Sequence, residues 1–200
     1  MKLKIIALLT VLSTTLSSYT NTISIKFAEQ HHIPTLIALN EELLDEYFGP
    51  TLVAGYPEYF SYDTPLLYEF REGWNYMFQI ILEEGIDQLN DHHILIASDD
   101  ENPDNIIGLC AFAKEDNSIH LEYLIVSQKL RNKGVGKMLL DTALTMYDDV
   151  TTCWLETIAK ANEKTHAFYE RYGFTSTKET HSLIECAPNT HIYYTLDIKK

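Results

Sequence analysis

The sequence predicts an α/β domain in which a central mixed, mostly antiparallel sheet is flanked by helices. Segments with apolar residues at every second position alternate along the chain with segments that keep helical spacing, as expected when helices cover a sheet. The chain has 200 residues, of which 46% are hydrophobic and 22% charged, which is enough apolar side chain for one core. This composition excludes disordered, collagen-like and low-complexity classes.

The first half of the domain predicts one strand and two helices. Residues 23–28 alternate between apolar and polar side chains, which predicts a strand. A helix then opens near Pro34, which suits a first helical position, and carries an apolar stripe of Leu36, Leu39 and Leu43. Residues 48–65 are rich in glycine and proline and predict a loop. Residues 66–84 predict the second helix.

The second half predicts a meander of strands followed by alternating helices and strands. Alternation predicts strands over the segments 93–98, 106–114, 118–127, 152–158 and 191–198, with a further strand after Phe174. Residues 99–105 predict the hairpin turn between the first two. Helical spacing predicts a helix over 134–147. A second helix is predicted over 162–172, with Asn162 as its N-cap and Gly173 as its C′ residue.

The N-terminal segment is typical of a secretory leader. Lys2 and Lys4 precede an apolar run over residues 5–12, which is too short to span a membrane, and small polar residues follow. We therefore expect a leader over residues 1–21 and the domain over residues 22–200. The alternatives are a strand or helix that packs on the domain, or a mis-assigned start. No later segment predicts a membrane span.

The charge balance and the cysteines limit the classes of partner. The chain has 29 acidic and 15 basic residues, which give a formal net charge of −14. Nucleic acid is therefore an unfavourable partner, and cations, including amines, are favourable ones. Cys110 and Cys153 fall on predicted strands and Cys186 in a predicted loop. Their spacing supports neither a disulfide framework nor a zinc site, so we expect no metal.

One basic segment in this acidic chain predicts an anion site. Gln128–Lys137 follows a predicted strand and opens a predicted helix, and it holds four of the 15 basic residues, Lys129, Arg131, Lys133 and Lys137. Gly134 and Gly136 allow a close backbone approach, and the helix N-terminus adds free N–H groups. The combination favours a phosphate or pyrophosphate. It is neither a Walker A loop nor a dinucleotide fingerprint, because Arg131, Met138 and Leu139 stand where those motifs need other residues.

Two motifs together resemble the GNAT superfamily of N-acetyltransferases. The residues Arg131 to Gly136 are similar to the family's acyl-CoA loop, Arg/Gln-x-x-Gly-x-Gly/Ala. A second family signature is matched by Asn162, Ala167, Phe168, Tyr169, Gly173 and Phe174. Residues 24–43 also look like the family's first strand and helix, so the resemblance covers residues 22–198.

The resemblance implies the GNAT acyl-CoA N-acyltransferase fold, with acetyl-CoA as the acetyl-donor cosubstrate. Strands four and five of that fold splay apart, and here they correspond to residues 118–127 and 152–158. The implied cofactor-binding residues are Leu124, Ile125 and Val126 for the pantetheine arm, Arg131, Asn132, Lys133, Gly134, Val135, Gly136 and Lys137 for the pyrophosphate, and Asn162 for the CoA arm.

The resemblance also implies catalytic residues, because acetyl transfer to an amine needs a base for the amine and a proton for the leaving thiolate. Tyr169 matches the family's frequent general acid, with aromatic packing as the alternative. Glu156 matches a fifth-strand glutamate used as a base by ribosomal-protein acetyltransferases of the family, although one extra residue separates it from Asn162. Glu122 is the rival base, His120 shares its face by alternation, and a water chain is a further alternative.

The acceptor is expected to be a primary amine. In this fold the region after the first helix usually shapes the acceptor site, and here it interleaves tyrosines with carboxylates, among them Tyr59, Tyr62 and Asp63. Aromatic faces and carboxylates suit a cation. A cationic small molecule and a peptide or protein amine both remain open.

We therefore expect an acetyl-CoA-dependent N-acetyltransferase; the alternative is a non-catalytic module of the same fold that binds CoA or a ligand. The expected partners are a small-molecule or peptide amine, with no nucleic acid and no stable membrane span, and the chain is expected to be a monomer or homodimer. The leader favours a secreted or periplasmic location, whereas the availability of acetyl-CoA favours the cytoplasm.

Overall fold

A seven-stranded sheet organises the chain in its computed structural model, which describes residues 23–45, 49–56, 72–73, 75–84, 92–160, 163–181 and 191–198. The strand order is β1-β2-β3-β4-β5-β7-β6. The strands are β1 (Ile23–Phe27), β2 (His92–Asp99), β3 (Asn102–Glu115), β4 (Ser118–Val126), β5 (Thr152–Ile158), β6 (Thr175–His181) and β7 (His191–Asp197). Among the described strands only the pair β4–β5 is parallel, which confirms the predicted mixed, mostly antiparallel sheet.

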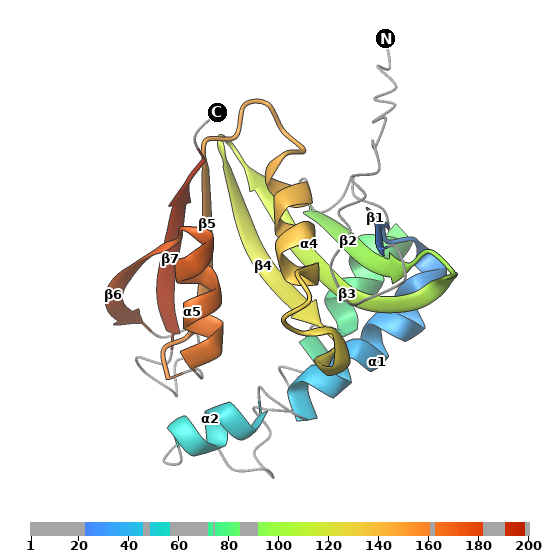
Figure 1. The fold of residues 1–200 in the computed structure, drawn as a ribbon, viewed down its shortest axis with the longest axis horizontal. Helices are drawn as coiled ribbons and strands as arrows, with labels where there is room; N and C mark the ends of the chain where they lie inside the picture. Colours follow the sequence, from blue (N-terminus) through green and yellow to red (C-terminus); the bar gives the residue numbers. More distant parts are fainter. Residues whose placement is uncertain are drawn as a thin grey trace.

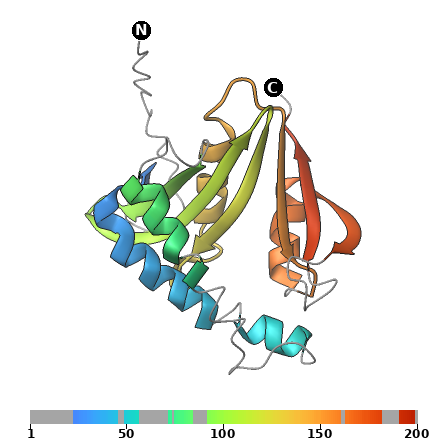
Figure 2. The same cartoon turned by 180° about the vertical axis from the view of Figure 1, so that it is seen from behind.

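Helices cover both faces of this sheet. The helices α4 (Val135–Leu144) and α5 (Glu163–Tyr172) lie on one face, and α1 (Ile33–Leu43) lies on the other together with a helical segment, 75–79, that continues into a π-helical turn, Ile80–Glu84 (Figures 1 and 2). The α4 face buries a core that includes Leu121, Leu139 and Leu155. The α1 face buries a second core that includes Leu36 and Phe78.

The parallel strands β4 and β5 pair over only part of their length. Their register runs from Ser118 opposite Thr152 to Leu121 opposite Leu155 and then stops. Beyond this point β4 stays paired with β3, while β5 stays paired with β7, so the strands diverge (Figure 1). The predicted splay between the fourth and fifth strands is confirmed.

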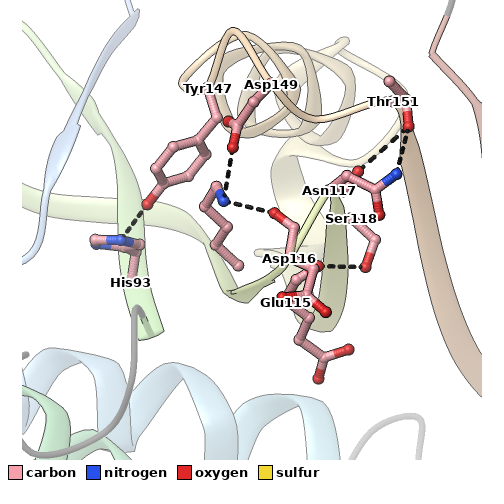
Figure 3. A network of polar contacts seen from close by, with 9 residues as sticks. His93, Glu115, Asp116, Asn117, Ser118, Tyr147, Asp149 and Thr151 are labelled. Carbon is pink, nitrogen blue, oxygen red and sulfur yellow. Dashed lines mark hydrogen bonds and ion pairs between the residues drawn. The ribbon is translucent and has the colours of Figure 1, made fainter.

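Polar contacts tie the strands at the end where they remain together (Figure 3). The Thr151 N–H donates to the Asn117 carbonyl at 2.8 Å, and the Asn117 side chain donates to Thr151 Oγ1 at 3.2 Å. Lys114 Nζ lies 3.0 Å from Asp149 Oδ2 and donates to the Asp116 carbonyl at 2.6 Å. These contacts join the β3–β4 turn to the chain entering β5, so divergence is possible only at the opposite end.

Three expectations are corrected at the edges of elements. The predicted loop 48–65 contains a helix, α2 (Gly49–Gly55), because Pro50 is compatible with a first helical turn and Leu52 is buried. The turn 99–105 is shorter, since β3 begins at Asn102 after two register shifts in β2. The helix 134–147 ends at Leu144, where the Thr145 hydroxyl donates to the Asp141 carbonyl and competes with further helical turns.

Several expectations fall on residues that the structure does not describe. These are the leader, the residues Asn162 and Cys186, and most of the predicted loop and second helix between 57 and 74. Cys110 and Cys153 are described and are buried with free thiols, as expected. Within the described ranges, no helix is long and apolar enough to cross a membrane, and no group of acidic, histidine and cysteine side chains is arranged to hold a metal ion.

Candidate active site at the splayed strands

The loop between β4 and α4 has a backbone geometry that suits an anion, and we call it the cradle. Asn132 and Gly134 both have left-handed backbone conformations, with φ of 63° and 84°. Such alternation turns successive N–H groups toward one point, a geometry that binds anions. Gly134 is the N-cap of α4 and provides no side-chain cap, so the first N–H groups of the helix keep their capacity for a ligand.

Two contacts fix this cradle against the sheet. The Arg131 Nε donates to the Val126 carbonyl at 3.0 Å and ties the loop to the end of β4. Gly108 on β3 lets α4 approach, because a Cβ there would lie 2.9 Å from the Ile125 carbonyl oxygen and 3.2 Å from Leu139 Cδ1. The anion site therefore depends on a residue of β3 that belongs to neither motif.

The edge of β4 beside the loop is available to an extended ligand. The Ser127 N–H donates to the Ile107 carbonyl on β3 at 2.9 Å. Because backbone groups alternate along a strand, those of Leu124 and Val126 face the β5 side, where pairing has ended. The backbone groups of Ile125 face β3 instead. A ligand with amide groups fits this edge as an added strand would.

The basic side chains of the loop differ in their contacts. Lys137 Nζ lies 2.6 Å from Asp141 Oδ2 within α4, and the Tyr172 hydroxyl donates to the other oxygen of Asp141 at 2.5 Å. Lys129 is exposed and Lys133 is half-buried. At the start of the loop, Glu42 of α1 accepts from the Gln128 N–H at 3.1 Å. The cradle thus depends on backbone groups more than on lysine side chains.

The two candidate glutamates are the first residues beyond the last β4–β5 pair. That pair is Leu121 with Leu155, so Glu122 follows it on β4 and Glu156 follows it on β5. Leu121 and Leu155 point into the α4-side core, and Trp154 and Glu156 therefore point to the opposite face. The register of β4 and β5 thus places both carboxylates at the point where the strands separate.

Glu122 occupies a bulge of β4. Tyr123 pairs with Ala111 and Leu121 with Phe112, so Glu122 has no partner residue on β3. Its Oε1 lies 2.9 Å from His92 Nε2, and its Oε2 is buried with no hydrogen-bond partner among the described residues. Burial raises the pKa of Glu122, while His92, by charge and by hydrogen bonding, opposes that rise. A base needs this kind of raised carboxyl pKa.

Glu156 and His120 belong to a more open aromatic surface. The Tyr193 hydroxyl donates to Glu156, and this hydrogen bond raises the pKa of Tyr193. The His120 ring stacks on Trp154 with centroids 3.6 Å apart and planes 3° apart. Burial lowers the pKa of His120, although the carboxylates of Glu115 and Glu156 oppose this effect. His120 is therefore held flat against an indole.

Tyr169 lies on the other side of the sheet, on α5. Its ring packs edge-on against Phe168 and Phe174 and lies 5.8 Å from the ring of Tyr194. The helix ends as predicted at Gly173, whose φ is 117° and whose N–H donates to the Tyr169 carbonyl at 3.1 Å. The candidate acid and the candidate bases are thus on opposite faces of the sheet, beside the same splay.

The structure adds residues that the sequence motifs did not single out and leaves others undescribed. His92, Glu115, Trp154, Tyr193 and Glu42 join the site through the contacts above. Alternation along β2 was the available signal for His92, since His93 faces the opposite side and contacts Tyr147. The predicted acceptor residues Tyr59, Tyr62 and Asp63 and the predicted CoA contact Asn162 lie outside the described residues.

Comparison with known proteins agrees with this geometry. Residues 38–174 match the acetyltransferase (GNAT) family. No curated protein matches the chain. Among solved structures, PaiA N-acetyltransferase from Thermoplasma acidophilum, in complex with coenzyme A, is similar with a TM-score of 0.60 and 19% identity, over 88% of this chain and 99% of that one.

Two further solved structures share the fold. NAA60 from Arabidopsis thaliana, in complex with a bisubstrate analogue, has a TM-score of 0.60 and 16% identity, over 89% of this chain and 99% of its own. The ribosomal-protein-S18-alanine N-acetyltransferase of Escherichia coli has a TM-score of 0.59 and 15% identity, over 89% and 95% of the two chains. At these identities the likeness is one of fold.

Proposed function

Because the chain belongs to the GNAT acetyltransferase family, we propose that it transfers the acetyl group of acetyl-CoA to a primary amine. The observation that carries the proposal is the splay of β4 from β5. Two carboxylates lie where the strands separate, and the loop that follows β4 has a backbone that suits an anion. Acetyl-CoA supplies a thioester that an amine can attack. The residues of this chain bind the donor and move the protons.

Three groups support binding of the donor. The backbone from Arg131 to Lys137 would hold the pyrophosphate, because its left-handed residues and uncapped helix N-terminus favour an anion. The β5-facing backbone groups of Leu124 and the Val126 N–H would hold the pantetheine amides, since the Val126 carbonyl already accepts from Arg131. Asn162 is proposed as a further contact from its sequence motif alone.

We propose that Glu122 is the base that accepts the proton from the amine. An amine in water is mostly protonated and cannot attack, so its proton must pass to a base first. The Glu122 side chain is only 14% exposed, has a raised pKa and has one oxygen without a partner among the described residues. Glu156 and His120 are then acceptor-side residues. Tyr169, on the opposite face, holds the proton that the leaving sulfur takes up.

The acceptor we propose is cationic. The surface beside the splay combines the Trp154 indole, the Tyr193 ring and the carboxylates Glu115 and Glu156, and rings with carboxylates attract cations. The face of β5 and β7 opposite α5 is not covered by a described helix (Figure 2). Tyr59, Tyr62 and Asp63 are proposed as further acceptor contacts from the sequence. The net charge of −14 favours such an acceptor over an anionic one.

Calorimetric titration of the full chain with acetyl-CoA tests the donor site. We expect micromolar binding by the native protein and at least a tenfold loss in Arg131→Glu and in Gly134→Asp, which place a negative charge in the cradle. The Lys26→Glu variant, which makes the same change of charge as Arg131→Glu at a half-buried position on β1, is the control. Absence of binding by the folded native chain contradicts the proposal.

Thiol release then tests turnover, with polyamines as the first acceptors and an N-terminal peptide amine as the second. Release of CoA with amine acetylation supports the enzyme. Binding of acetyl-CoA without turnover of any amine supports the non-catalytic module instead.

A further inference from the structure

A histidine on β2 contacts the carboxylate to which we assign the proton. His92 Nε2 lies 2.9 Å from Glu122 Oε1, and the two side chains are only 21% and 14% exposed. His92 belongs to neither sequence motif, and its strand is separated from β4 by the whole of β3. The contact is therefore a product of the fold.

The sheet is built so that these side chains can meet. His92 pairs with Ala113 on β3, and Ala113 pairs with His120 on β4. Ala113 and Ala111, two residues apart on β3, present only methyl groups on this face, which leaves room for an imidazole to reach across the strand. The β4 bulge removes Glu122 from pairing with β3 and brings its carboxylate within reach.

The two carboxylate oxygens of Glu122 have different surroundings. Oε1 is held by His92, whereas Oε2 is buried and has no hydrogen-bond partner among the described residues. Burying a carboxylate oxygen without a hydrogen bond costs free energy. Such an atom therefore favours binding of a group that donates a hydrogen bond to it. An ammonium group provides such a partner.

We propose that His92 is a positioning residue for acetyl transfer: it fixes one oxygen of Glu122 so that the other oxygen accepts a proton from the incoming amine. The inference rests on the function proposed above. The ammonium gives one proton to the carboxylate, which becomes a carboxylic acid, and the neutral amine keeps the electron pair with which it attacks. His92 donates its Nε2–H throughout and contacts no reacting atom.

The surrounding charges set the direction of the pH effect. Around Glu122 lie His92 from β2, Glu115 from the end of β3 and His120 from β4, with Glu156 of β5 facing His120. Loss of His92 removes the group that favours the ionised form and leaves burial and Glu115, which disfavour it. The acidic limb of the rate profile therefore moves to higher pH when His92 is replaced.

The test compares His92→Leu with His92→Gln, since the glutamine amide can still donate near the position of Nε2. For His92→Leu we expect a loss of about tenfold in kcat/KM at neutral pH and an acidic limb displaced to higher pH. His92→Gln recovers most of the rate. Ala113→Val fills the space over β3 without changing either partner and has the same effect as His92→Leu. The exposed His31→Gln is the control.

A second readout does not need turnover. Carboxylate NMR with labelled glutamate follows Glu122, whose signal is identified by its loss in Glu122→Gln. We expect Glu122 to titrate at higher pH in His92→Leu than in the native protein, with His92→Gln in between. The same titration midpoint in the native chain and in His92→Leu overturns the inference.

The kinetic outcomes separate the inference from the proposed function. A native chain that acetylates no amine overturns the proposed function and the catalytic role of the pair, while the NMR titration still reports on the contact. Full activity in Glu122→Gln overturns the inference and the assignment of the base to Glu122, while the proposed acetyl transfer stands. Loss of activity in Glu122→Gln with an unchanged profile in His92→Leu shows that Glu122 acts without His92, and also overturns it.

Discussion

Strand geometry and hydrogen-bond partners distinguish the two carboxylates that flank the splay. Glu122 lies on a bulge, is mostly buried and contacts His92, whereas Glu156 lies in a regular strand and accepts from the more exposed Tyr193. Burial disfavours the ionised form of Glu122, so the reaction is expected to slow as the pH falls through its raised pKa. Residues at equivalent positions on adjacent strands therefore have different chemistry.

Tyr169 provides a test at the level of a single oxygen atom. Tyr169→Phe keeps the ring that packs against Phe168, Phe174 and Tyr194, so folding is retained. If the hydroxyl is the proton donor, kcat falls by about 10²-fold or more, as is usual for loss of a general acid. Affinity for acetyl-CoA, measured by calorimetry, stays within a factor of about two of the native value.

The matched control for this change is Tyr172→Phe. Tyr172 lies on the same helix, and its hydroxyl donates to Asp141 rather than to a ligand. Unchanged turnover in Tyr169→Phe would leave its ring with a packing role only, and a water molecule would then supply the proton.

At the scale of elements, the cradle depends on how closely α4 packs on β3. Gly108 allows that approach, because any Cβ at this position meets the carbonyl of Ile125 and the side chain of Leu139. Gly136, within the first turn of α4, has ordinary space around it, with Phe168 at 3.5 Å and Val126 at 3.6 Å from a built Cβ. Two glycines near the same loop therefore differ in their tolerance of a methyl group.

Gly108→Ala is expected to lower the free energy of unfolding by about 1–3 kcal/mol, because the added methyl group overpacks the helix–sheet contact. Gly136→Ala, the matched control, is expected to leave it unchanged or raise it by up to about 1 kcal/mol, since alanine favours a helix. Urea denaturation of both variants measures the difference. Equal stability of the two variants would show that α4 can move away from β3 without cost.

At the scale of the whole molecule, the sheet consists of two parts joined over a short parallel pairing. β1 to β4 form one part, and β5, β7 and β6 form the other (Figure 1). The pairing of β4 with β5 covers the stretch from Ser118 to Leu121, and a continuous core on the α4 side, including Leu121, Leu155 and Tyr194, also joins the parts. A ligand held at the splay stabilises both parts at once.

Coenzyme A is therefore expected to stabilise the fold and to protect one edge of β4. At about 100 times its dissociation constant, it should raise the free energy of unfolding by about 2.7 kcal/mol. Hydrogen exchange should slow at Leu124 and Val126, whose N–H groups face β5. The Ser127 N–H is already bonded to Ile107 and serves as the internal control. Equal slowing at all three amides would indicate general stabilisation instead of binding at this edge.

Local sequence was sufficient for most of the architecture. Alternation along β5 and helical spacing along α4 predicted their positions because one face of each element is buried and the other is not. The loop 48–65 was the main error: its glycines and prolines indicate a turn, but a buried Leu52 and a proline in the first turn are compatible with α2. Burial against distant residues outweighed local preference there.

The sequence alone determined the fold family and predicted an anion site in the loop before α4, because glycines, helix starts and strand periodicity act through neighbouring residues. The tertiary structure decided that Glu122 lies on a bulge, that Gly108 lets α4 approach β3, and that His92 reaches Glu122 across β3. These features depend on a bulge in β4 and on small residues in β3. The residues that meet are far apart in the sequence, so the local pattern of either strand does not predict their contact. The chemistry of the site is thus set by strand register, which only the assembled sheet defines.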